Sequence, residues 1–210
     1  MNHHEHHSHS EHEGHEQWSW DKRFAEHGWP TEPDPLLVEL ASTIPPCKAL
    51  DLGCGTGRNA LWLAKQGFEV TGVDASSVGL AEAARRAEAE GVHIELIQAD
   101  LYSYEPLPTS YGLVVIANIH PLPEDAHRLY GMARKALKDG GHMFIIGHHL
   151  EMLGHHGPPD PARLYTENSL RESLPPGLLI ERLERVERAH GSDIGSQQDV
   201  SVFVWATATG

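Results

Sequence analysis

Short apolar runs alternate along most of the chain with longer segments in which apolar residues recur at helical spacing. Strands are predicted over residues 48–52, 68–74, 93–99, 113–117 and 142–147. Helices rich in Ala, Leu, Glu and Arg are predicted between them over residues 58–66 and 76–90. Because strands that alternate with helices usually form parallel pairs joined by helical crossovers, the pattern predicts an α/β fold with helices on both faces of a sheet.

The clearest helical pattern covers residues 124–138. Its apolar residues fall on one face, and they are Ala126, Leu129, Tyr130, Ala133 and Leu137. Gly140 and Gly141 follow and are expected to stop this helix. Nearer the N-terminus, residues 36–43 are predicted to form a short helix that ends before the Pro45–Pro46 pair, because proline cannot continue a helix.

The last third of the chain has a different pattern. A stretch rich in glycine and proline after His149 leads to a short helix predicted over residues 166–174, with Thr166 as its cap. Residues 178–189 are ambiguous, because their apolar residues are three apart as in a helix, whereas the Pro and Gly residues before them favour a strand. Residues 199–208 are β-branched and aromatic on both faces, which predicts a strand inside a sheet.

The length of the chain fits one domain with extensions. At 210 residues it is long enough for one α/β core and too short for two of ordinary size. Residues 1–17 hold seven histidines and no apolar residue after Met1, so we expect a disordered extension. Residues 18–45 are expected to form an aromatic and helical cap, in which Trp18, Trp20 and Phe24 pack on the domain formed by residues 46–210.

Charge and composition argue against several classes of partner. The formal net charge of -14 disfavours nucleic acid, because proteins that bind phosphates normally offer a basic face. No apolar stretch approaches the length of a membrane span, and the sequence has no signal-peptide pattern, so no membrane partner is expected. A disulfide between Cys47 and Cys54 would distort the turn after the first predicted strand, and we therefore expect a reducing, cytoplasmic location.

Three alternate glycines follow the first predicted strand in the sequence LDLGCGTGRN. Gly53, Gly55 and Gly57 have no Cβ atom, so the backbone can turn sharply and approach a ligand closely. The next predicted strand ends in Asp74, where a carboxylate can accept hydrogen bonds from both hydroxyls of a ribose. A dinucleotide fingerprint would need Gly or Ala where this chain has Arg58, and no triphosphate-binding pattern occurs.

The pattern D-x-G-x-G-x-G from Asp51 to Gly57 resembles motif I of the class I S-adenosylmethionine-dependent methyltransferases. The resemblance runs from about Pro35 to His149 and includes Asp74, the IQADL segment and the strand YGLVVIANIH. It implies S-adenosyl-L-methionine as the cofactor. It also implies a doubly wound, mostly parallel seven-stranded sheet with an antiparallel last strand, in which residues 178–189 form a strand.

The resemblance assigns the cofactor contacts to the carboxyl ends of the strands, where ligands of doubly wound sheets lie. It implies that Asp51 and the glycine turn hold the methionine moiety and that Asp74 holds the ribose. It further implies that Asp100 binds the adenine amino group, although this residue can also simply cap a turn. The full predicted set is Asp51, Gly53, Gly55, Gly57, Asp74, Ala75, Asp100, Leu101 and Asn118.

Histidines after the fourth and fifth strands are the candidates for acceptor chemistry. His120 is the candidate catalytic base, because a neutral imidazole can take a proton near pH 7, but it can equally be a structural polar residue. His148, His149, His155 and His156 can line a polar acceptor site or lie in a solvated loop. They lack a recognised zinc spacing, so no metal is predicted there. The His-rich tail is a possible site for a divalent metal.

The acceptor is expected to be a small molecule. The phrase CGTGRNALWLAKQGFEVTGVD resembles the tellurite-resistance methyltransferases, chiefly through the Arg58–Asn59 pair. This resemblance implies a soft nucleophile, such as a chalcogen oxyanion or a thiol, and a detoxifying role. Two alternatives stay open. One is a methyltransferase of a small organic metabolite with an O- or N-acceptor in an aromatic pocket, and the other is a non-catalytic module that binds the cofactor or a metal.

Overall fold

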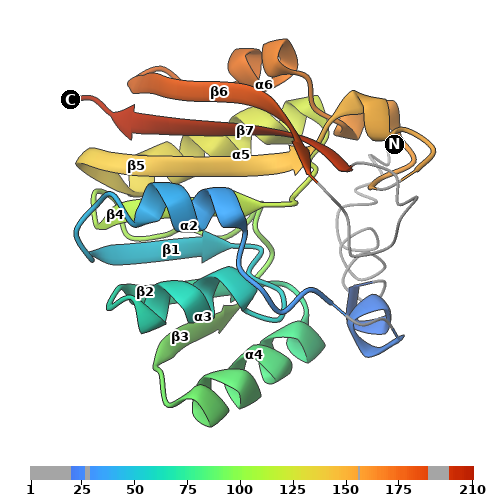
Figure 1. The fold of residues 1–210 in the computed structure, drawn as a ribbon. Coiled ribbons are helices and arrows are strands. Elements are labelled where there is room, and N and C mark those ends of the chain that lie inside the picture. Colours follow the sequence, from blue (N-terminus) through green and yellow to red (C-terminus); the bar gives the residue numbers. More distant parts are fainter. Residues whose placement is uncertain (1–19, 27–28, 156, 189–198) are drawn as a thin grey trace, which may run out of the picture.

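The computed structural model describes residues 20–26, 29–155, 157–188 and 199–210, and its centre is a seven-stranded sheet with the order β3-β2-β1-β4-β5-β7-β6 (Figure 1). The strands are β1 Lys48–Leu52, β2 Glu69–Asp74, β3 Ile94–Gln98, β4 Tyr111–Ala117, β5 Leu137–His148, β6 Leu178–Arg188 and β7 Asp199–Ala208. The pairs among β1 to β5 are parallel, and β7 runs antiparallel to both β5 and β6. The predicted doubly wound sheet with an antiparallel last strand is confirmed.

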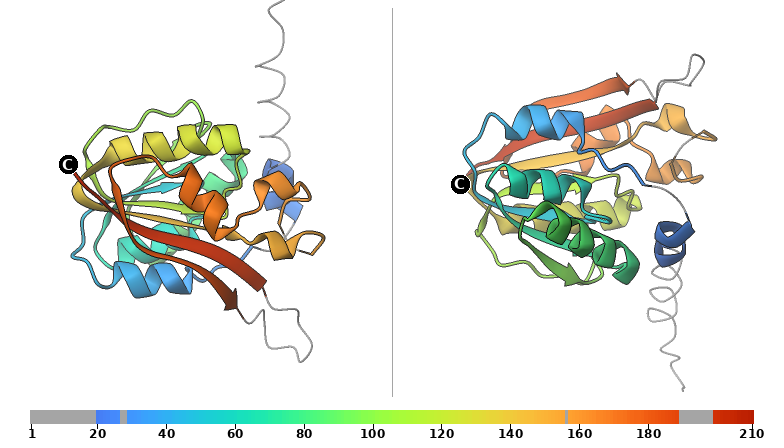
Figure 2. Two further views of the ribbon diagram at one scale, coloured as in Figure 1. Left: turned by 90° about the horizontal axis from the view of Figure 1, so that it is seen from above. Right: turned by 60° about the horizontal axis from the view of Figure 1, so that its bottom comes forward.

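Helices cover both faces of the sheet (Figure 2). They are α2 Pro35–Ala41, α3 Arg58–Lys65, α4 Ser77–Glu90, α5 Pro123–Ala136 and α6 Glu167–Ser173, with short 3-10 helices η1 Leu150–Met152 and η2 Pro161–Arg163. One apolar core joins α2 and α3 to the strand face that carries Phe144 and Phe203. The other joins α5 and α6 to the face that carries Ile145 and Val204. The central strands are apolar on both faces because both faces are buried.

Polar caps set several of these helix starts. Asp34 accepts a hydrogen bond from the backbone N–H of Leu36 before α2, and Ser76 accepts one from Gly79 before α4. Thr166, predicted as a cap, forms a capping box with Ser169 at the start of α6. These side chains satisfy backbone donors that have no partner within the helix.

The end of α5 differs from the prediction. The helix stops at Ala136, and Gly140 and Gly141 lie within β5 instead. Leu137 is buried and pairs with Tyr111 of β4, and the register then shifts so that Leu113 pairs with His142. Gly140 has a φ of 73° and lies in this irregular stretch. Strand pairing therefore ends the helix before the glycines do.

The carboxyl ends of β1, β2, β4 and β5 point to one edge of the sheet, where the helix of residues 20–26 and the segment after β5 also lie (Figure 1). Helix α2 buries Leu37, Leu40 and Ala41 in the same core as the sheet. The extension predicted for residues 1–17, together with Trp18, lies outside the described residues. Among the described helices, none is long and apolar enough to cross a membrane.

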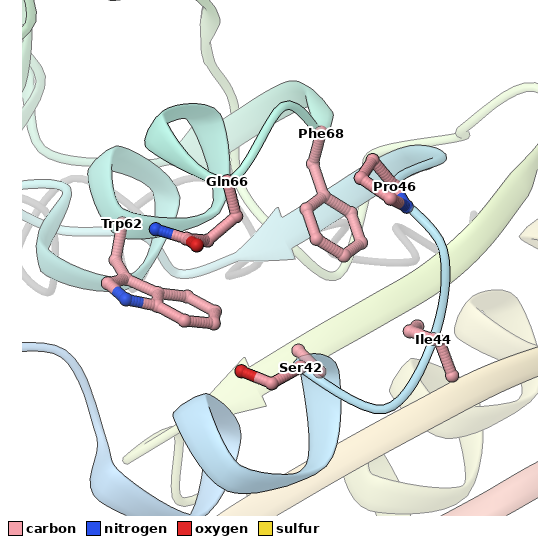
Figure 3. A pocket seen from close by; sticks show the side chains of 7 residues that line it. Ser42, Ile44, Pro46, Trp62, Gln66 and Phe68 are labelled. Carbon is pink, nitrogen blue, oxygen red and sulfur yellow. The ribbon is translucent and has the colours of Figure 1, made fainter.

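A pocket with a volume of about 220 Å³ lies near the other edge of the sheet. Trp62, Gln66 and Phe68 line it from the side of α3, and Ser42, Ile44 and Pro46 line it from the end of α2 and the loop before β1 (Figure 3). Pro46 and Phe68 shortly precede β1 and β2, so this pocket is at the amino ends of the strands. The predicted site residues lie at or just after the carboxyl ends of the strands, so they are at the opposite edge of the sheet from this pocket.

Candidate cofactor and acceptor site

The turn between β1 and α3 depends on three glycines in the left-handed conformation. Gly53, Gly55 and Gly57 have φ values of 76°, 53° and 80°. A Cβ atom on Gly53 would lie 2.2 Å from Cδ1 of Ile119, and one on Gly57 would lie 2.9 Å from Cβ of Ala83. Other residues would be strained at these positions and would fill the space above the turn.

Asp74 ends β2 and ties the glycine turn to the next loop. Its Oδ2 accepts a hydrogen bond from the Gly55 N–H at 2.8 Å, and its Oδ1 accepts one from the Ser76 N–H at 2.8 Å. Burial raises the pKa of Asp74, these two N–H groups lower it, and the neighbouring charge of Asp21 raises it. Because each carboxylate oxygen has a second lone pair, Asp74 can still accept hydrogen bonds from a ligand.

Asp51 lies at the end of β1 with 2% of its surface exposed. Among the described residues, its Oδ2 is the only buried side-chain nitrogen or oxygen that lacks a hydrogen-bond partner. Burial raises the pKa of Asp51 to about 7, although the charge of Arg58 opposes this shift. A buried oxygen without a partner costs free energy, so this position suits a ligand that brings a donor or a positive charge.

The segment after β3 brings Leu101, another predicted residue, close to the turn. Cδ1 of Leu101 lies 3.5 Å from the position that a Cβ on Gly53 would take, so Gly53, Leu101 and Ile119 converge. Asp100 accepts a hydrogen bond from the Tyr102 N–H at 2.7 Å, which is the turn-capping contact left open by the sequence. Ala75 is half-buried, and its carbonyl accepts a hydrogen bond from the Gln98 side chain at 3.2 Å.

Asn118 directly follows β4 and has a φ of 58°. Asparagine tolerates this left-handed conformation better than most residues do. Its N–H donates to the Ile146 carbonyl at 2.8 Å, which holds the end of β4 beside β5. The side chain of Asn118 is exposed at the carboxyl end of β4.

The segment before α2 covers the glycine turn. The Phe24 ring lies 3.0 Å from the position of a Cβ on Gly55, and it packs against Trp20 and Trp29 with centroid distances of 6.0 and 4.7 Å. Oδ1 of Asp21 accepts a hydrogen bond from the Ser76 hydroxyl at 2.5 Å. Sequence reasoning missed Asp21, because nothing in its local pattern indicates a contact 55 residues away.

His120, which follows β4, is held firmly by contacts with Arg163. Its Nδ1–H donates to the Arg163 carbonyl at 3.0 Å, and the Arg163 guanidinium donates back to the His120 carbonyl at 2.9 Å. Burial, and to a smaller extent the charge of His148, lowers the pKa of His120 to about 4. Both roles predicted for His120 stay open, but these contacts favour the structural one. Arg163 had no sequence signal.

Tyr165 is a buried support of this region. Its hydroxyl donates to the Ile119 carbonyl at 2.6 Å and forms a hydrogen bond of 2.8 Å with the Tyr130 hydroxyl. Its ring stacks on that of His120 at a centroid distance of 5.3 Å. Tyr165 is only 6% exposed, so it braces the loop after β4.

Within the described part of the chain, no group of three or more His, Cys, Asp or Glu side chains is arranged to hold a metal ion. His148 instead stacks on His120 and lies beside Asp199, and His149 accepts a hydrogen bond from the Glu151 N–H. The His-rich tail, predicted as a possible divalent-metal site, lies outside the described residues.

Comparison with known proteins identifies the fold and the cofactor. Residues 49–141 match the methyltransferase domain family. TehB of Haemophilus influenzae, named a probable S-adenosyl-L-methionine-dependent methyltransferase, is 40% identical over 65 residues, which cover 31% of this chain and 23% of TehB. The crystal structure of TehB superposes with a TM-score of 0.67 at 22% identity and covers 90% of this chain and 67% of that one. Over this part of its length, the chain is similar to the class I S-adenosylmethionine-dependent methyltransferases. The predicted cofactor, S-adenosyl-L-methionine, is thereby confirmed.

Other relatives show how far the similarity extends. The demethylmenaquinone methyltransferase of Thermus thermophilus is 34% identical over 112 residues, which cover 52% of this chain and 50% of that protein. A solved chain from work on the conversion of a disulfide bond into a thioacetal group during echinomycin biosynthesis superposes with a TM-score of 0.75 at 20% identity and covers 93% of both chains. The chain thus spans half or less of the length of these sequence relatives, and the matches support the fold and the cofactor class alone.

Proposed function

We propose that this protein is a methyltransferase that transfers the methyl group of S-adenosylmethionine to a small-molecule acceptor. The observation that supports it most is the meeting of an unpartnered buried Asp51 oxygen with the glycine turn and Asp74 at one edge of the sheet. When bound, the cofactor supplies a methyl group on a positively charged sulfur. The chain's own task is to orient the reactants and exclude water.

The described residues suit each part of this cofactor. Oδ2 of Asp51 is available for the ammonium group of the methionine moiety, which would remove the cost of leaving this oxygen unpaired. Asp74 keeps lone pairs for the ribose hydroxyls while it holds Gly55 in place. The missing Cβ of Gly53 leaves room between Leu101 and Ile119. Asp100 is the proposed partner of the adenine amino group.

For the acceptor we favour a soft nucleophile, such as a thiol or a chalcogen oxyanion. The similarity to TehB supports this choice, but it covers only 65 residues. His120, His148 and Arg163 add a polar, partly buried lining on the acceptor side. The alternative is a small organic metabolite, which is favoured by relatives named for demethylmenaquinone and for ubiquinone biosynthesis.

One experiment tests the proposed function in two steps. Calorimetric titration with S-adenosylmethionine and S-adenosylhomocysteine should show binding, and titration with NAD as a control should show none. Acceptors are then screened by release of S-adenosylhomocysteine, with tellurite, selenite, small thiols and phenols in separate reactions. Turnover of tellurite, selenite or thiols supports the soft-nucleophile class, and turnover of phenols alone supports the alternative. Cofactor binding without turnover of any acceptor would favour a non-catalytic module.

Replacing Asp74 with Ala is expected to weaken S-adenosylmethionine binding. The variant loses the ribose contacts and releases the Gly55 N–H that Asp74 holds at 2.8 Å. Loss of one or two such hydrogen bonds costs about 1 to 3 kcal/mol, or roughly 5- to 150-fold in affinity. Calorimetry on this variant and on Asp139→Ala, an exposed acid outside the proposed site, measures the effect. Unchanged affinity in Asp74→Ala would mean that the ribose lies elsewhere.

Any binding of a divalent metal is proposed to depend on residues 1–17. The described residues offer no cluster of ligands, so a variant without this tail should show no binding in titrations with Zn(II) or Ni(II). The full-length chain should bind with modest affinity through its closely spaced histidines. Identical isotherms for the two proteins would contradict the proposal.

A further inference from the structure

A histidine and an aspartate far apart in the sequence meet at the carboxyl end of β5. His148 is the last residue of β5, and Asp199 is the first residue of β7. The antiparallel register, in which His148 pairs with Ser201, brings the two side chains together. Nδ1 of His148 lies 3.3 Å from Oδ1 of Asp199, and the side chains are only 20% and 15% exposed.

This contact defines the orientation of the His148 ring. A carboxylate beside Nδ1 favours the tautomer that carries its proton on Nδ1, which leaves the Nε2 lone pair available. No described residue makes a hydrogen bond to His148 Nε2. The ring lies parallel to that of His120, with 5.2 Å between centroids and 9° between planes. A Cβ on Gly157 would lie 2.8 Å from Cδ2 of His148, so the loop after β5 also holds the ring in place.

His120 is arranged differently, although its ring is stacked on that of His148. Its Nδ1–H is used by the Arg163 carbonyl, and its Nε2 faces the backbone N–H of His148 at 3.5 Å. Burial lowers the pKa of His120 to about 4, so this imidazole holds an added proton weakly at pH 7. Of the two rings, only His148 combines a carboxylate partner with an Nε2 that no described residue uses.

We propose that His148, oriented by Asp199, takes the proton from the methyl acceptor during transfer; this rests on the methyltransferase activity proposed above. The acceptor lone pair forms the bond to the methyl carbon, and the electrons of the carbon–sulfur bond return to sulfur, which becomes neutral. The acceptor proton moves to Nε2 of His148 and then to solvent. Asp199 is a positioning residue that holds the tautomer and stabilises the imidazolium.

The inference predicts which acceptors need His148. An acceptor that carries its proton at pH 7 requires the base, whereas one that is already ionised requires only positioning. The described ionisable groups on the elements around His148 include His120 after β4, Asp199 on β7, and His149, Glu151, Arg163 and Tyr165 on the segment after β5. Because several groups titrate nearby, the pH dependence of kcat is assigned to His148 only by comparing the wild type with matched variants.

The test compares two thiol probes in the full chain. 2-Mercaptoethanol keeps its S–H at pH 7, and 4-nitrothiophenol is ionised. His148→Gln should lower kcat for 2-mercaptoethanol by about 100-fold or more, which is the usual size of general base catalysis, and should leave kcat for 4-nitrothiophenolate nearly unchanged. Asp199→Asn should show a smaller loss of the same kind. His93→Gln, at an exposed site outside the cluster, is the control for the substitution itself.

Two further measurements, of cofactor affinity and of the histidine tautomers, separate the proposed catalytic role from a structural one. S-Adenosylhomocysteine should bind His148→Gln and wild type equally, which separates a catalytic loss from a folding defect. Nitrogen NMR of the histidine rings should show His148 with its proton on Nδ1 in the wild type and a changed tautomer in Asp199→Asn. A proton on Nε2 in the wild type would overturn the proposal, as would an equal loss with both thiols or a larger loss in His120→Gln than in His148→Gln. Absence of wild-type turnover with every acceptor screened would instead overturn the proposed function, and the NMR result would still decide the geometry of the pair.

Discussion

Replacing Asp51 with Asn is expected to stabilise the cofactor-free protein at pH 8 and to weaken its binding of S-adenosylmethionine. The Asp51 carboxyl is 2% exposed, and burial raises its pKa to about 7. The folded protein therefore binds this proton more tightly than the unfolded chain does. The contribution of this proton to the free energy of unfolding is fully present below the unfolded pKa of about 4. It is lost as the pH rises towards 7, and the total loss is on the order of 4 kcal/mol.

The opposite trend is expected for cofactor binding. The ionised carboxylate is the form that attracts the ammonium group of the methionine moiety, so wild-type affinity should rise with pH up to about 7 and then level off. Asn cannot supply this charge. A hydrogen bond to a charged group contributes about 1.5 to 3 kcal/mol, so the variant should bind roughly 10- to 150-fold more weakly at pH 8.

Two measurements check this pair of effects. Thermal unfolding of the cofactor-free protein at pH 5 and pH 8 should show a gain in Tm for Asp51→Asn at pH 8 that is much smaller at pH 5. Calorimetric titration over the same range should show a flatter pH dependence in the variant, with the residual slope due to Asp74, whose pKa is also raised. Glu88→Gln removes one exposed negative charge and is the matched control. Equal stability of Asp51→Asn and wild type at pH 8 would show that the buried charge carries no cost.

The fold and the cofactor turn could be predicted because their signals are local. The strands β1 to β5 are apolar runs, and Gly53, Gly55 and Gly57 occupy left-handed positions that few other residues adopt. Asp74 also had a local signal, since it ends an apolar run. What the sequence could not show is that Asp74 already accepts hydrogen bonds from Gly55 and Ser76, because these contacts depend on how the two loops meet.

The acceptor side could not be predicted in the same way, because its contacts are set by tertiary register. Arg163 meets His120 across 43 residues, and Asp199 meets His148 across 51. Neither partner lies in a local pattern that distinguishes it from other surface charges. The predicted end of α5 was wrong for a related reason. Residues 137–139 are compatible with a helix, and only the pairing of Leu137 with Tyr111 makes them a strand.

Replacing Gly147 with Ala is expected to damage the acceptor side while sparing the cofactor side. A Cβ at this buried position would lie 2.4 Å from Cε2 of Tyr165 and 2.8 Å from Cε1 of His120. Neither ring can move easily, because Tyr165 is fixed through the Ile119 carbonyl and Tyr130, and His120 is fixed through Arg163. Overpacking of this kind costs about 1 to 3 kcal/mol, which corresponds to a fall in Tm of roughly 2 to 12 °C.

Gly131→Ala is the matched control for this substitution. Gly131 lies inside α5 with nothing within 4 Å of its would-be Cβ, so the added methyl group should stabilise the helix by about 1 kcal/mol. Gly147→Ala should also lower turnover of every acceptor that the wild type uses, because it displaces the rings beside His148. Calorimetry should nevertheless show wild-type affinity for S-adenosylhomocysteine. The cofactor contacts proposed for β1, β2 and β3 do not pass through Gly147, so an equal loss of cofactor affinity and turnover would mean that the two sides of the site are not separable. An unchanged Tm would mean that Tyr165 and His120 yield freely, and the ring stack would then be too mobile to hold a base in position.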